Sequence, residues 1–171
     1  TTNDAVTQAK NPGAISVDSV TPKPVAKPAA KQAIDDALKA KNDAIDANND
    51  LTAEEKAKAK EDAKAKADAA KTAIDNATTN DAVEQAKNAG ATSVSSVTPT
   101  PAAKPAAKQA IDDALKAKND AIDSNNDLTA EEKAKAKEDA KAKADAAKQA
   151  IDNATTNDAV TQAKNAGATS V

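Results

Sequence analysis

The feature that most constrains this chain is an internal repeat with a period of 77 residues. When the chain is shifted by 77 positions, residues 1–94 align with residues 78–171, and 85 of the 94 pairs are identical. Such repeats are typical of architectures in which each unit packs mainly against its neighbours. Because a second active site adds little to a catalyst, whereas spacers and multivalent binders gain directly from copying, the repeat favours a structural or adhesive role.

The apolar content is mostly alanine, which predicts helices with thin cores. The chain has 47 alanines against 20 Ile, Leu and Val residues, and it has no Phe, Tyr, Trp or Met. So few large apolar residues also fit a disordered polyampholyte. Against that alternative, the net charge is only −3, and alanine has the highest helix propensity of all residues. We therefore predict an all-α fold whose units have low stability.

The missing residue types exclude several classes of function. Without Cys or His, the chain has no thiol nucleophile, no imidazole and no usual zinc ligand set. Its 24 basic residues are all Lys and are outnumbered by 27 acidic residues, so we expect no nucleic-acid partner. No apolar run approaches the roughly 18 residues of a membrane span, so we expect no membrane insertion. We expect no enzymatic activity, no cofactor, and no catalytic, cofactor-binding or metal-ligating residue.

Each unit is predicted to contain three amphipathic helices, at residues 29–47, 52–77 and 79–97, because apolar residues recur there at intervals of three and four. Thr52 and Glu55 have the spacing of a capping box at the start of the second helix. Three such helices with short connections predict a small three-helix bundle. The large apolar residues expected in its core are Ile34, Leu38, Ile45, Leu51, Ile74, Val83, Val94 and Val97.

Gly90 lies in the apolar stripe of the third helix, where two roles are possible. A glycine either ends a helix or lets a neighbouring helix approach closely because it has no side chain. Since the apolar stripe continues to Val97, we favour the close approach.

Proline-bearing segments at residues 22–28 and 99–105 are predicted to be extended linkers between units. In one division of the chain, the remaining segments are residues 1–21 as the third-type helix of a preceding repeat, 29–98 as the first repeat and 106–171 as a second, C-terminally truncated repeat.

An alternative division places the bundles at residues 1–77 and 78–154, with residues 155–171 as a partial copy. The sequence leaves both divisions open. Either one gives tandem small three-helix bundles in an elongated, rod-like array with Ala-rich cores and Pro-bearing linkers.

Two acidic segments imitate functional motifs. Residues 46–50 look like the start of a calcium loop, but Leu51 stands where the loop needs Gly and Ala57 stands where it needs a bidentate Glu. Glu54 and Glu55 are adjacent acids, yet nothing apolar is available to bury them and shift their pKa values for acid–base work. We therefore expect a helix stop and a solvated helix face at these positions.

The lysines of the second helix form a ridge, because Lys56, Lys60 and Lys64 are four residues apart. We interpret this ridge as a solubilising face; contact with anionic wall polymers is the alternative. Opposite charges four residues apart are expected to pair along the helix, as Glu54–Lys58, Asp62–Lys66 and Lys71–Asp75.

Several segments resemble a known family, namely residues 106–112 (AAKQAID), 120–123 (DAID), 126–133 (NDLTAEEK) and 150–157 (AIDNATTN). They are similar to a helical tandem repeat of unknown function from wall-anchored surface adhesins of Gram-positive bacteria, in SasC-like, Mrp-like and Ebh-like arrays. The resemblance covers essentially the whole chain and occurs in both copies. It implies a cell-surface array that projects an N-terminal adhesive region and is linked to aggregation and biofilm, and it brings no catalytic residues.

The function expected from repeat and resemblance together is a stalk, a spacer that holds a distal adhesive region away from the cell wall. The alternative is a multivalent binding module for host or wall components, or for homophilic contact between cells, in which copying raises avidity. We expect a monomeric chain whose main partners are its neighbouring repeats. We also expect an extracellular, wall-anchored location, with the signal peptide and the sorting signal outside this internal fragment.

Overall fold

The computed structural model describes residues 3–8, 10 and 25–171, and these residues form helices and short connections without any strand. The all-α prediction is therefore confirmed. The long helices are α2 (Ala26–Ala47), α3 (Ala53–Asn76), α4 (Asn80–Ser95), α5 (Ala103–Ser124), α6 (Ala130–Asn153) and α7 (Asn157–Ser170). Residues 3–8 and 10 are also helical. The other residues of the predicted N-terminal helix (1–2, 9 and 11–21) and residues 22–24 of the first predicted linker lie outside the described residues.

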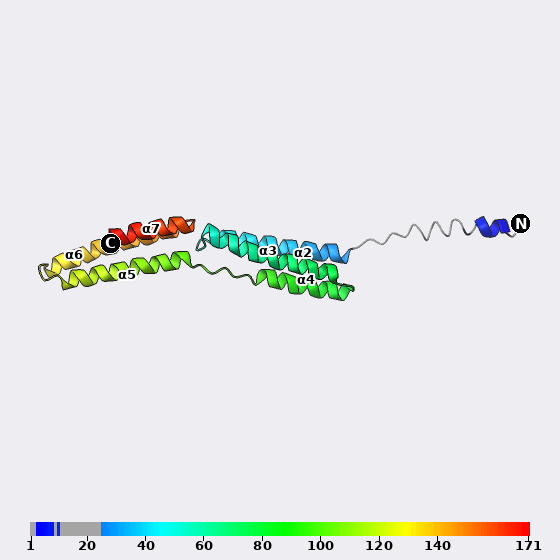
Figure 1. Cartoon of the computed structure of the whole chain (residues 1–171), viewed down its shortest axis with the longest axis horizontal. Helices are drawn as coiled ribbons and strands as arrows, with labels where there is room; N and C mark the ends of the chain where they lie inside the picture. The colour runs from blue at the N-terminus through cyan, green and yellow to red at the C-terminus, as the bar shows by residue number, and fades with distance from the viewer. Residues whose placement is uncertain (1–2, 9, 11–24) are drawn as a thin grey trace.

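The helices pack in two groups of three. Helices α2, α3 and α4 contact one another and form what we call the first bundle, and α5, α6 and α7 form the second bundle in the same way. The two bundles lie end to end along the long axis of the molecule, and the segment between α4 and α5 joins them (Figure 1). The predicted tandem helical bundles are thus present.

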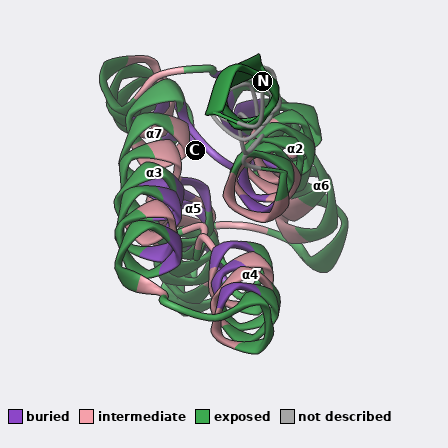
Figure 2. Cartoon of the chain, turned by 90° about the vertical axis from the view of Figure 1, so that its right-hand side faces the viewer, coloured by how far each residue is buried: buried purple, intermediate pink, exposed green. Residues whose placement is uncertain are grey.

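The core of each bundle is narrow because small side chains fill much of it. In the first bundle, Ile34, Ile74 and Val94 are completely buried, and the face of α3 that meets them is lined by alanines such as Ala63 and Ala67, which are also fully buried. Viewed along the molecule, the buried residues lie on the sides of the helices that face one another (Figure 2). Of the predicted core residues, Leu38 is half-buried and the other seven are buried.

Gly90 lies where α4 packs against Ala70 of α3 and Ile34 of α2. A Cβ atom at this position would lie 2.4 Å from the Cβ of Ala70 and 2.9 Å from the Cδ1 of Ile34, much closer than such atoms approach each other. Helix α4 continues through Gly90 to Ser95. The glycine therefore permits a close helix approach, as favoured from the sequence, and Gly167 has the same surroundings in the second bundle.

Two expected boundaries are wrong by three residues. Helix α2 begins at Ala26 rather than at residue 29, and α5 begins at Ala103 rather than at residue 106. Pro28 and Pro105 thus lie inside the first helical turn, where proline costs no hydrogen bond because the N–H groups there have no partner within the helix. The expected linker at residues 99–105 is consequently shorter, and residues 103–105 belong to α5.

The three ion pairs expected along α3 are not among those that the described residues form: Glu54 accepts from the N–H of Asn157, and Lys66 donates to the hydroxyl of Ser96. Lys71 pairs with Asp35 of α2, and Asp75 pairs with Lys31 of α2, so these charges bridge two helices instead of one helical turn. Helix α2 runs antiparallel to α3 and places oppositely charged side chains beside these residues, and the sequence pattern does not show this arrangement. Pairs four residues apart do form elsewhere, for example between Lys64 and Asp68 at 2.5 Å. Exposed pairs of this kind contribute little to stability, about 0–1 kcal/mol each.

Candidate functional site: the joint between the bundles

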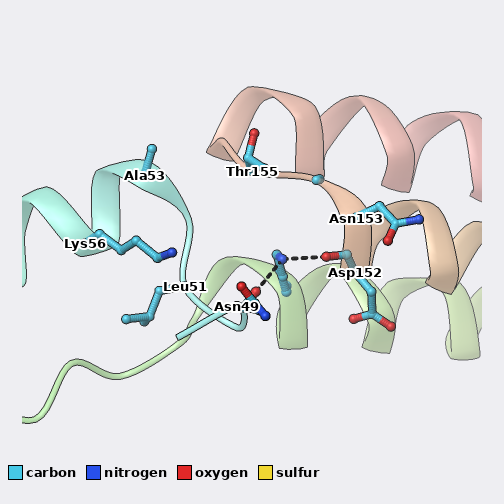
Figure 3. A pocket seen from close by; sticks show the side chains of 9 residues that line it. Asn49, Leu51, Ala53, Lys56, Asp152, Asn153 and Thr155 are labelled. Carbon is cyan, nitrogen blue, oxygen red and sulfur yellow. Dashed lines mark hydrogen bonds between the residues drawn. The ribbon is translucent and has the colours of Figure 1, made fainter. Parts of the chain in front are cut away.

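The two bundles meet at a polar joint formed by segments far apart in the sequence. The first bundle contributes the turn between α2 and α3, and the second contributes the start of α5 and the turn between α6 and α7. Figure 3 shows the cleft of about 400 Å³ between them. The residues that line this cleft are Asn49, Leu51, Ala53, Lys56, Lys104, Asp152, Asn153, Ala154 and Thr155.

Lys104 is the buried cation of the joint. It is the second residue of α5, and only 5% of its surface is exposed. Its Nζ donates hydrogen bonds to the carbonyl oxygen of Asn49, at 2.8 Å, and to that of Asp152, at 2.7 Å (dashed lines in Figure 3). Because carbonyl groups at the end of a helix carry partial negative charge, the carbonyl of Asp152 near the end of α6 compensates the ammonium group. Lys104 thereby connects the first bundle with two helices of the second.

The two carboxylate oxygens of Glu55 accept hydrogen bonds from two different bundles. Oε2 accepts a hydrogen bond from the backbone N–H of Thr52, at 3.0 Å, and so closes the predicted capping box of α3. Oε1 accepts hydrogen bonds from the N–H groups of Ala102, at 2.9 Å, and Ala103, at 3.0 Å. Ala102 is the N-cap residue of α5 and Ala103 is its first residue, and α5 forms no side-chain cap within its own bundle. Glu55 therefore caps a helix of the neighbouring bundle.

The start of α7 is held in a similar way. The N–H of Asn157 donates to Oε2 of Glu54 at 3.0 Å, and the side-chain oxygen of Asn157 accepts from the hydroxyl of Thr52 at 2.8 Å. Close by, the backbone N–H of Ala53 donates to the carbonyl oxygen of Thr155 at 2.8 Å. Residues more than 100 positions apart in the sequence are thus joined by three short hydrogen bonds.

The hydrogen bonds of the joint keep both glutamates ionised. Hydrogen bonds from its own backbone N–H and from that of Asn157 lower the pKa of Glu54 below its ordinary value. For Glu55, partial burial acts to raise the pKa, but the N–H groups of Thr52, Ala103 and Ala102 outweigh it, and the net pKa is lowered. A carboxylate that is held ionised by backbone donors is suited to capping helices and unsuited to act as a general acid.

The solvated helix face predicted at Glu54 and Glu55 describes them incompletely. Glu54 is exposed and Glu55 is half-buried, but both carboxylates also accept hydrogen bonds from the next bundle. A signal for this role was present in the sequence. Helices α3 and α4 begin with a Thr whose side chain caps them, but Val25 and Ala102 precede α2 and α5 and have no side chain that can act as a cap. A helix start without a cap indicates an acceptor supplied from elsewhere.

The segment that imitates a calcium loop is a helix end. The carboxylate of Asp46 pairs with Lys60 at 2.6 Å, its carbonyl oxygen accepts from Lys56 at 2.8 Å, and the side chain of Asn48 accepts from the N–H of Asp50. These contacts also show that Lys56 and Lys60 of the ridge are bound to acceptors of their own bundle. Within the described residues, no three acidic side chains converge as metal ligands would. Nor does any helix in that part of the chain have the length and apolar content needed to cross a membrane.

Comparison with known proteins gives the chain a family. Residues 26–102 and residues 103–171 each match the family described as Domain of Unknown Function (DUF1542). Among curated proteins, the chain is 34% identical over 166 residues to "Extracellular matrix-binding protein ebh" of Staphylococcus aureus strain MRSA252, and 35% identical over 166 residues to "Extracellular matrix-binding protein EbhA" of strain Newman.

These matches cover 97% of this chain but only 2% and 5% of the two relatives. No solved structure matches the chain. The two family matches meet between Ala102 and Ala103, which is the point at which Glu55 accepts its two hydrogen bonds from α5. Because the two matches together span most of its length, the chain belongs to the DUF1542 family.

Proposed function

We propose that this chain is part of a stalk, a rod-like spacer of tandem bundles in an extracellular, wall-anchored bacterial surface protein. The observation that carries the proposal is the joint. Bundles joined by a flexible linker alone would need no specific contacts between them, whereas here Lys104, Glu54 and Glu55 bind backbone groups of the adjoining bundle. We further propose that one repeat unit is one bundle, with residues 26–102 as the first unit.

The dimensions of the bundles suit a spacer. Helix α3 has 24 residues, so one bundle is about 36 Å long at a rise of 1.5 Å per residue. End-to-end docking adds nearly the whole of this length with each copy. A compact globule of the same mass would extend less far, and a flexible coil, whose span grows only with the square root of its length, extends less far once several copies follow one another.

The outer faces of the bundles fit an inert rod. Many lysines are paired with acids of the same bundle, as Lys31 is with Asp75 and Lys108 with Asp152. Large apolar side chains are exposed at Val6 and Val25 and not elsewhere in the described part of the chain. Binding surfaces usually present aromatic or Arg anchors, and this sequence has neither.

A multivalent binding module is the second candidate, and the names of the relatives favour it. Two Staphylococcus aureus relatives are named extracellular matrix-binding proteins. If the repeats themselves bind, then each copy carries a weak site and the array gains affinity from effective concentration. Homophilic contact between cells is a variant of this candidate.

The experiment that separates the two candidates varies the number of copies. Because the period is 77 residues, appending copies of residues 95–171 after Val171 continues the array in register. For a spacer, the maximum dimension from small-angle scattering rises in equal steps of roughly 40 Å per copy, and capture on a reconstituted extracellular matrix does not change. Growth with the square root of copy number would contradict the spacer. Capture that rises steeply with copy number would support the binding module instead.

A further inference from the structure

We infer that the end of each bundle formed by Thr52, Glu54 and Glu55 is a docking surface that supplies the helix caps of the bundle that follows it. We call these three residues the capping end, and their equivalents in the second bundle are Thr129, Glu131 and Glu132. The inference rests on the proposed array of docked bundles. It adds the partner of the docking surface, which is the start of another bundle of this family, and the direction of the contact along the array.

The first line of support is the pattern of missing caps. Helices α3, α4, α6 and α7 each begin after a Thr whose side chain accepts a hydrogen bond from the first turn. Helices α2 and α5 begin after Val25 and Ala102 and, within the described residues, form no side-chain cap of their own. For α5, the missing acceptor is Glu55 of the preceding bundle. A cap of this kind is typically worth about 1 kcal/mol, and a negative charge at a helix start adds to it.

The second line of support is that each half of the joint occurs twice in the described part of the chain, once in contact with the other bundle and once without such a contact there. Thr52 is fully buried in the joint, whereas Thr129 at the open end of the second bundle is exposed. In the docked copy the Thr hydroxyl donates to Asn157, and in the open copy it donates to Glu132 of its own bundle, at 2.9 Å. Likewise Lys104 is buried, whereas Lys27 at the start of the first bundle is half-buried and donates to the carbonyl of Asp75.

The identity of the partner follows from the chemistry of the two surfaces. The capping end offers carboxylates, and Asn49 beside it offers a backbone carbonyl; the opposite end of a bundle offers helix N–H groups and an ammonium group. The surfaces are complementary to each other and not to themselves, so they form a head-to-tail contact that continues as an open array instead of closing as a two-fold dimer. The open capping end of the second bundle has the same residues as the docked one, and it therefore fits the start of a further bundle.

The contact has a direction. The carboxylates belong to the preceding bundle and the uncapped helices belong to the following one. Loss of the capping end therefore weakens the start of the next bundle rather than that of its own, apart from the capping box of α3. In an array, each bundle therefore stabilises the first helical turns of the bundle that follows it.

The test uses the two copies as matched controls in the full chain. Glu55→Gln and Glu132→Gln change equivalent capping boxes, but of these two glutamates only Glu55 accepts hydrogen bonds from the start of α5. Hydrogen exchange by NMR, with isotope labelling confined to residues 98–171 to separate the near-identical signals, measures opening at the start of α5. We expect Glu55→Gln to speed exchange of the first-turn amides of α5 by about three- to tenfold, and Glu132→Gln to change it by less than twofold. Equal effects of the two variants would overturn the inference.

A longer chain gives an independent test. When one more copy of residues 95–171 follows Val171, Glu132 gains a successor. Glu132→Gln should then speed exchange at the start of the new bundle as Glu55→Gln does at α5; no effect there would overturn the inference. Exchange could be unchanged in all variants while spin labels on neighbouring bundles keep one fixed distance. This result would contradict the inference that Glu55 caps the next bundle, but it would still support the proposed spacer. A broad distance distribution would contradict the spacer itself.

Discussion

The ends of the two bundles have the same sequence and different surroundings. Residues 51–56 and 128–133 are identical, and the capping box forms in both copies. Yet Leu51 and Thr52 are buried, whereas Leu128 is half-buried and Thr129 is exposed. The local sequence therefore sets the capping box, and the adjoining bundle sets the burial and the second set of hydrogen bonds. The contacts of the joint therefore cannot be predicted from the sequence of a single repeat.

The interiors of the bundles, in contrast, are nearly the same. Ile34 and Ile111 are both completely buried, as are Ile74 and Ile151. A substitution made at equivalent positions in the two copies should therefore have equal effects inside the bundles and unequal effects at the joint. The following predictions use this difference.

The largest effect is expected from truncating the central isoleucine. Ile34→Ala and Ile111→Ala each remove a completely buried side chain and should each destabilise their bundle by about 2–5 kcal/mol. The two losses should agree within about 0.5 kcal/mol, as for independent sites in equivalent surroundings. Calorimetric unfolding of the full chain measures both, and a large difference would show that the bundles are not equivalent.

The next effect concerns the close helix approach. Gly90→Ala and Gly167→Ala place a methyl group 2.4 Å from the Cβ of Ala70 or Ala147. Overpacking costs about 1–3 kcal/mol and outweighs the gain in helix propensity of about 1 kcal/mol. Urea unfolding should show a similar loss for both variants. Adding Ala70→Gly to Gly90→Ala should recover part of the loss, and a further loss in the double variant would contradict the steric explanation.

A smaller effect separates the two ends. Thr52→Ala and Thr129→Ala each remove a helix cap, at a cost of about 1 kcal/mol. Thr52→Ala also removes the part-buried hydrogen bond to Asn157, whereas Thr129→Ala removes an exposed one to Glu132, so the loss at Thr52 should be larger by about 0.5–1.5 kcal/mol. The difference in unfolding free energy between the two variants measures how much the hydrogen bond across the joint contributes to stability. Equal losses would mean that the hydrogen bond across the joint contributes nothing to stability.

The smallest effect is the dependence on pH. The pKa values of Glu54 and Glu55 are lowered in the folded chain from an ordinary value of 4.5. Their contribution is therefore fully present above about pH 4.5 and is lost as the pH falls through the lowered values. Acidification should widen the distance distribution between the bundles before helicity is lost. Glu54→Gln with Glu55→Gln should widen it already at neutral pH, and an unchanged distribution in that variant would contradict the prediction.

Much of the bundle can be derived from the sequence, because its determinants lie close together along the chain. Apolar residues at intervals of three and four within each helix identify the buried faces that hold Ile34, Ile74 and Val94, and the continuing stripe around Gly90 predicts the close helix approach. The partner of Lys71 could not be derived, because Asp35 and Asp75 are both within its reach and the choice depends on how α2 packs on α3. The missing cap at the start of α5 indicates an acceptor from elsewhere, but the sequence does not identify Glu55 as that acceptor, because its donors are 47 and 48 residues away.

The most direct test of the docked joint is the distance between the bundles in solution. The chain has no Cys, so Lys39→Cys and Lys116→Cys, at equivalent and well-exposed positions of α2 and α5, give a specifically spin-labelled chain. Pulsed electron paramagnetic resonance should show one narrow distance distribution centred at roughly 40 Å, about one bundle length. A broad distribution at neutral pH, as expected for bundles on a flexible linker, would contradict the account.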